Sequence, residues 1–105
     1  MKTFQENLAG LPGIDGIARL ELLDSDSNIV VAIENKPGSQ GSLRIYRHLA
    51  DKHGVITPEA AQEGLALYAE HTEDARANPG KHPNVDRLFA VIEGAGKLST
   101  RVIPA

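Results

Sequence analysis

The loop ENKPGSQGS at residues 34–42 has the residue types of an anion-binding loop. Gly38 and Gly41 allow backbone N–H groups to turn toward one point, and Ser39 and Ser42 add hydroxyl donors. A helical pattern begins directly after the loop, so the positive end of that helix faces these donors. This arrangement suits a phosphate, sulfate or carboxylate group. The candidate ligand-binding residues are Lys36, Gly38, Ser39, Gly41, Ser42 and Arg44.

The same loop also fits an ordinary junction between a strand and a helix. Pro37 and Gly38 form a typical turn dipeptide, and Ser39 or Ser42 can cap the helix that follows. No lysine follows Gly41, as a nucleotide-binding P-loop requires, and the glycines lack the GxGxxG spacing of dinucleotide-binding loops. The sequence therefore disfavours nucleotide hydrolysis. It leaves open whether the loop binds a small anion or only caps a helix.

A second group of ionisable side chains surrounds His71 and His82, which flank Glu73 and Asp74 in the sequence. An imidazole beside a carboxylate can act as a general acid or base. The alternative to a binding protein is therefore a small enzyme that holds a phosphorylated or carboxylated metabolite on residues 36–42 and uses His71 or His82 for proton transfer. The spacing of the histidines matches no metal-binding motif, so we predict neither a metal site nor a cofactor.

The composition indicates one globular domain over residues 1–105. Hydrophobic residues make up 41% and charged residues 24% of the sequence, both near the averages of folded proteins. The absence of cysteine excludes disulfides and cysteine nucleophiles, and no apolar run reaches the length of a membrane span. We expect a cytoplasmic protein that does not enter a membrane.

The charge distribution bears on possible partners. A net charge of -3 argues against electrostatic capture of nucleic acid or of an anionic membrane surface. Residues 34–53 contain four basic and two acidic side chains, whereas residues 54–80 contain one basic and five acidic ones. Pairing between solvated faces of one chain explains this contrast, and self-association through complementary charges is the alternative.

Alternating and β-branched patterns predict three strands. In residues 17–23 (IARLELL) the side chains of Leu20 and Leu22 share one face, residues 29–31 are β-branched, and residues 97–103 alternate again. The polar run DSDSN at residues 24–28 predicts a tight hairpin turn between the first two strands. This run begins like a calcium-binding EF-hand loop but lacks the required glycine and glutamate. The pattern does not decide which strand the last one pairs with.

Helical spacing predicts a short N-terminal helix and three main helices. Phe4, Leu8 and Leu11 form the first pattern, and the main helices are expected near residues 43–53, 57–77 and 85–92. Thr57 is a strong helix-capping residue, and Gly64 can permit a neighbouring helix to approach closely. The predicted fold class is α+β, with a three-stranded sheet and three main helices between the hairpin and the last strand.

Several stretches resemble a family of short bacterial proteins known only as a domain of unknown function. These stretches are IARLELLD, ENKPGSQGSLRIY, EGLALYAEHTEDARANPGKHPN and DRLFAVIE, and the likeness covers most of the chain. The resemblance implies a bacterial cytoplasmic protein. It implies no activity, substrate or functional residue.

The predicted strands place further apolar residues on the second sheet face. If Leu20 and Leu22 lie under the helices, Ile17, Leu23 and Ile103 point to the opposite face, which residues 4–11 or a second copy of the chain must cover. We therefore expect a self-associating binding module rather than an enzyme. Its expected partners are a second copy, as a dimer, and either another protein or a small anionic ligand.

Overall fold

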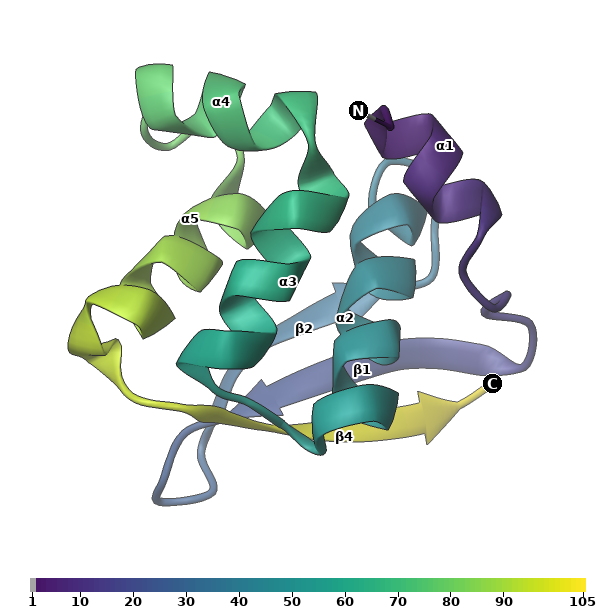
Figure 1. Cartoon of the computed structure of the whole chain (residues 1–105). Coiled ribbons are helices and arrows are strands. Elements are labelled where there is room, and N and C mark those ends of the chain that lie inside the picture. The colour runs from purple at the N-terminus through teal and green to yellow at the C-terminus, as the bar shows by residue number, and fades with distance from the viewer. Residues whose placement is uncertain (1) are drawn as a thin grey trace.

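The computed structural model describes residues 2–105, in which an antiparallel sheet carries helices on one face only (Figure 1). The predicted α+β class is confirmed, although the sheet has four strands rather than three. The elements are α1 (Phe4–Ala9), β1 (Ile17–Leu23), β2 (Ile29–Glu34), α2 (Gln40–His53), β3 (Val55–Ile56), α3 (Pro58–Tyr68), α4 (Glu70–Ala77), α5 (Pro83–Ala90), the π-helical turn η1 (Val91–Ala95) and β4 (Leu98–Pro104).

The strand order is β2-β1-β4-β3, and every neighbouring pair is antiparallel. The C-terminal strand β4 therefore lies beside β1, at the centre of the sheet (Figure 1). Leu20 pairs with Ile33 on one side and with Val102 on the other, so these three side chains share the face under the helices. The unpredicted strand β3 contains two residues and pairs only with the start of β4.

The turn between β1 and β2 is held by one aspartate side chain. Asp24 Oδ1 accepts hydrogen bonds from the backbone N–H groups of Asp26, at 2.9 Å, and Asn28, at 3.0 Å. An aspartate in this position imitates a backbone turn and closes the chain on itself. The hairpin predicted from DSDSN is confirmed.

The sheet face that has no helices carries an ion-pair network at its centre, not an apolar patch. Glu21 accepts hydrogen bonds from Arg101, at 2.6 and 2.8 Å, and from Arg19, at 3.2 Å. These guanidinium groups hold the pKa of Glu21 below its usual range, and they cover its side chain. We expected Ile17, Leu23 and Ile103 to form an apolar patch on this face that needs a cover. Ile17 instead belongs to the core, Leu23 is buried, and Ile103 pairs with Arg19 beside the charged side chains.

Helix α1 packs on the helical layer and leaves the open sheet face uncovered (Figure 1). Thr3 and Glu6 form a reciprocal capping box at its start. The backbone N–H of Phe4 donates to Glu70 Oε1 at 2.8 Å, and the Phe4 ring stacks on Tyr68 with centroids 5.7 Å apart. Of the two covers considered for the second sheet face, residues 4–11 are therefore not the one, because their apolar side chains pack against α2 and α3.

The predicted helix over residues 57–77 is two helices. Thr57 caps α3 by accepting from the N–H of Ala60 at 3.2 Å, as expected, but the chain turns at Ala69, whose φ is 51°. The turn frees carbonyl groups at the end of α3, and the hydroxyl of Thr72 donates to one of them, Leu65 O, at 2.5 Å. Within residues 2–105 no helix has the length and apolar character needed to cross a bilayer.

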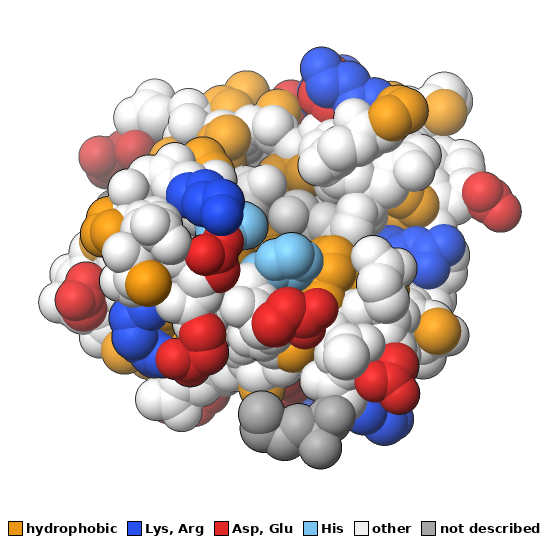
Figure 2. Space-filling model, turned by 90° about the horizontal axis from the view of Figure 1, so that it is seen from above, with side chains coloured by type: hydrophobic (Ala, Val, Ile, Leu, Met, Phe, Trp, Pro, Cys, Tyr) orange, Lys and Arg blue, Asp and Glu red, His pale blue; other side chains and the backbone are white. Residues whose placement is uncertain are grey.

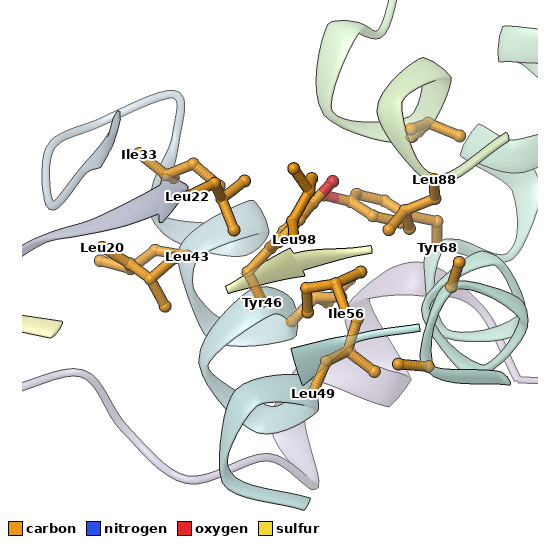
Figure 3. Close-up of a cluster of buried hydrophobic side chains, with 14 of the residues drawn as sticks. Leu20, Leu22, Ile33, Leu43, Tyr46, Leu49, Ile56, Tyr68, Leu88 and Leu98 are labelled. Atoms are coloured by element: carbon orange, nitrogen blue, oxygen red, sulfur yellow. The ribbon is translucent and has the colours of Figure 1, made fainter. Parts of the chain in front are cut away.

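The core lies between the sheet and helices α2, α3 and α5 (Figure 3). The side chains of Tyr46 and Leu49, on α2, are fully buried in this core. Gly64 allows the close approach that its position predicts: a Cβ atom there would lie 2.7 Å from Leu88 Cδ1 and 2.9 Å from Leu49 Cδ1. The α2, α3 and α5 contact therefore depends on the missing side chain at this position.

One carboxylate fastens the end of α2 to α3. Glu63 interacts with His48 Nε2 at 2.7 Å, Lys52 Nζ at 2.8 Å and His53 Nε2 at 3.2 Å. Lys52 and the two histidines lower the pKa of Glu63 to about 2. This cluster pairs the basic segment with the acidic one inside a single chain, which is the intramolecular explanation of the uneven charge distribution.

Candidate functional site

An open cleft of about 940 Å³ lies in the helical layer, between α1, the start of α2, the α3–α4 junction and the segment before α5. Viewed from above the helices, histidine side chains occupy the middle of this surface, with acidic and basic groups beside them (Figure 2). The polar side chains that line the cleft include Asp15, Asn35, Gln40, Ser42, Arg44, His71, Lys81 and His82.

The start of α2 forms one wall of the cleft. Gly38, Gln40, Gly41 and Ser42 line it, and the first N–H groups of a helix have no acceptor within that helix. The positive end of the helix therefore faces the cleft. Gln40 Nε2 donates to Asn35 Oδ1 at 3.0 Å. This hydrogen bond links two side chains that both line the cleft.

The hydroxyl group of Ser42 lines the cleft and can donate a hydrogen bond there. The buried hydroxyl of Tyr68 donates to Ser42 Oγ at 2.7 Å. Burial raises the pKa of Tyr68 far above its usual range, so this hydroxyl stays protonated and keeps its role as donor. The hydrogen of Ser42 is then available to an acceptor, such as an oxygen of a bound anion.

Arg44 supplies a positive charge that no acidic side chain neutralises. Its Nη1 donates to the carbonyl of Leu8 at 3.4 Å, and within residues 2–105 it forms no ion pair. A guanidinium group has five N–H donors in a planar fork, so most of its donors remain free. Arg44 can therefore hold an oxyanion in the cleft.

His71 and His82 meet across the cleft from α2. Their ring centroids are 5.2 Å apart, and the edge of the His71 ring meets the Phe4 ring at 4.5 Å. His82 Nε2 lies 2.7 Å from Asp74 Oδ2, and Lys81 Nζ lies 2.9 Å from the same oxygen. These two partners, His82 foremost, lower the pKa of Asp74 to about 2. Asp74 thus orients one imidazole and partly neutralises Lys81.

The candidate anion-binding residues do not all lie in this cleft. Gly38, Gly41, Ser42 and Arg44 line it, but Lys36 and Ser39 do not.

Ser39 was expected either to bind an anion or to cap the helix, and its hydroxyl does something else. It donates to the carbonyls of Glu34, at 2.6 Å, and Lys36, at 3.2 Å, and makes no capping bond to α2. The serine therefore closes the turn after β2.

Two loop glycines have structural reasons of their own. Gly38 has a φ of 92°, a region that favours glycine. A Cβ atom at Gly41 would lie 2.8 Å from the Phe4 ring, so the absence of a side chain allows α1 to pack on α2.

Sequence reasoning missed two contributors to the cleft. Tyr68 reads as a buried helical residue, and its contact with Ser42 depends on the packing of α3 against α2. Gln40 belongs to no motif. Within the part of the chain that the structure describes, no three His, Asp or Glu side chains are arranged to hold a metal ion.

The fold and the cleft define a small α+β protein with a polar surface cleft. The chain belongs to the bacterial family DUF2322, described as uncharacterized protein conserved in bacteria, whose model matches residues 4–102. No curated protein and no solved structure matches it.

Proposed function

We propose that this protein binds a small anionic ligand, a phosphate or carboxylate compound, in the cleft at the start of α2. The observation that carries the proposal is Arg44, a cation without an acidic partner in the described chain, in the same cleft as the first turn of α2. Charge-assisted hydrogen bonds from a guanidinium and backbone donors at a helix start are the usual means of holding an oxyanion.

The other cleft residues support an anion more than a cation. Ser42 has a hydrogen to donate, Lys81 is shared between Asp74 and the cleft, and the His71 imidazole adds a ring N–H donor. Among the described residues that line the cleft, Asp15 is the only acidic one. The binding site is therefore built mainly from donors.

Thermal unfolding in phosphate tests the proposal. A ligand at ten times its Kd stabilises the folded state by about 1.4 kcal/mol, which corresponds to about 6 °C in Tm for a chain of this length. We expect Arg44→Ala to lose this gain. Lys36→Ala, which removes a cation outside the cleft, should keep it.

Sodium chloride at equal ionic strength separates binding from screening. Phosphate titration followed by NMR should shift the amide signals of Gly41 and Ser42 in the wild type and not in Arg44→Ala. An equal response of the wild type and Arg44→Ala, or no response in either, would remove the proposal.

A second candidate function is acid–base catalysis on the bound anion. The observation that favours it is the pair of His82 and Asp74 in the same cleft as Arg44, with His71 beside it. A carboxylate that orients an imidazole is a common arrangement for proton transfer. The test is turnover of a panel of phosphate and carboxylate esters: activity that survives His82→Gln and His71→Gln would exclude this role, and so would the absence of turnover in the wild type.

A further inference from the structure

Strand β2 forms an edge of the sheet, and its residues 31–34 pair regularly with β1, with an irregularity of register at Val30. It lies at one end of the order β2-β1-β4-β3, and its residues Ile29 and Val30 are 53% and 52% exposed. Its sequence IVVAIE has no lysine, arginine or proline, the residues that usually keep edge strands apart. A glutamate at its end is its single charge.

The other free edge of the sheet is protected. Strand β3 covers only the first two residues of β4, so positions 100–104 also lie at an edge. There the strand carries Arg101 and ends in Pro104, and both discourage the addition of a strand. The two edges therefore differ in their capacity to pair.

The hydrogen-bond pattern shows which backbone groups of β2 are free. The N–H of Asn35 donates to Ala18 O at 2.9 Å, so Asn35 and Ala18 form a hydrogen-bonded pair. In an antiparallel ladder such pairs recur at every second residue, which directs the N–H and C=O of Ile33 toward β1. The N–H and C=O of Ala32 and the N–H of Glu34 therefore point away from β1, whereas the Glu34 carbonyl accepts from the Ser39 hydroxyl.

We propose that β2 pairs with β2 of a second copy of this chain, antiparallel and about a twofold axis at Ala32, to give a homodimer with one continuous eight-stranded sheet. In this register the two Ala32 residues exchange both backbone hydrogen bonds. Val31 lies opposite Ile33 of the second copy, and the symmetry repeats this apolar contact.

The charges of β2 agree with a second copy as the occupant. Each Glu34 lies opposite Val30 of the other chain, so the two carboxylates are about 14 Å apart along the strands and do not repel at close range. The edge is thus complementary to itself in hydrogen bonding, in apolar side chains and in charge. The dimer does not depend on the cleft, which lies in the helical layer.

Sedimentation equilibrium over about 10 µM to 1 mM protein tests the dimer. The wild-type mass should rise with concentration from 11.2 kDa toward twice that value. Ala32→Pro removes an N–H that makes no bond within the sheet, so the folded monomer persists and the mass should stay at 11.2 kDa. Val102→Pro makes the same change at the free edge of β4 and should dimerise like the wild type.

Ala32→Lys is the second variant, in case proline disturbs the strand. It places two ammonium groups opposite each other at the axis and should also prevent dimerisation. Hydrogen exchange of the Ala32 amide should slow with protein concentration in the wild type and in Val102→Pro, and exchange at position 32 of Ala32→Lys should not. A wild-type mass of 11.2 kDa at every concentration overturns the proposal, and so does dimerisation of a folded Ala32→Pro or Ala32→Lys variant.

Discussion

Replacement of Glu63 by glutamine measures how firmly one carboxylate joins α2 to α3. Lys52, His48 and His53 lower its pKa from 4.5 to about 2. A pKa unit is worth about 1.4 kcal/mol, so the full shift corresponds to about 3 kcal/mol, and solvent around the exposed Lys52 reduces this to about 2 kcal/mol. We expect Glu63→Gln to lower the free energy of unfolding by about 2 kcal/mol at neutral pH.

The sign of the pH dependence follows from the lowered pKa. The ionised Glu63 stabilises the fold above the unfolded-state pKa of 4.5, and this contribution disappears as the pH falls from 4.5 through about 2. Urea unfolding at about pH 5, 4 and 3 should therefore show a shrinking difference between wild type and Glu63→Gln. Glu93→Gln, at an exposed residue with no ion pair in the described chain, serves as the control. A difference that stays constant over this range would refute the reasoning.

Three further substitutions test other parts of the structure. Thr57→Ala removes the cap of α3 and should cost about 1 kcal/mol in urea unfolding; an unchanged midpoint would mean that the cap contributes nothing. Gly64→Ala should destabilise by about 1 kcal/mol despite the better helix propensity of alanine, because the new methyl group meets Leu88 and Leu49; a more stable variant would contradict this packing. Asp74→Asn removes a negative charge beside the cleft and should tighten phosphate binding about threefold in a titration at pH 7; weaker binding would place the anion elsewhere.

Local sequence patterns were sufficient to predict the strands and helices whose apolar residues recur at regular spacing. The alternation in residues 17–23 and the capping residue Thr57 gave β1 and the start of α3. The break at Ala69 contains no glycine or proline that would predict it. It is accompanied by a hydrogen bond from the Thr72 hydroxyl to the Leu65 carbonyl at the end of α3. Strand β3 is too short to show alternation, and it exists only because β4 lies beside it.

The candidate site shows the same division between local and tertiary information. The residue types predicted an anion site near Arg44 and proton-transfer groups at His71 and His82, and the structure places all three in one cleft. It also shows that the Ser39 hydroxyl turns inward and that Lys36 lies outside the cleft. Side-chain direction in a turn depends on bonds to the preceding strand, and no residue pattern encodes it.

The central position of β1 has a consequence for the order of folding. Its hairpin partner β2 follows within a few residues, but its other partner β4 comes from the far end of the chain, and the ion pair between Glu21 and Arg101 spans 80 residues. Closure of so long a loop is entropically costly, so we expect docking of β4 to limit the folding rate. Until β4 docks, β1 has an open side, and we expect the partly folded chain to expose a second strand edge to neighbouring chains.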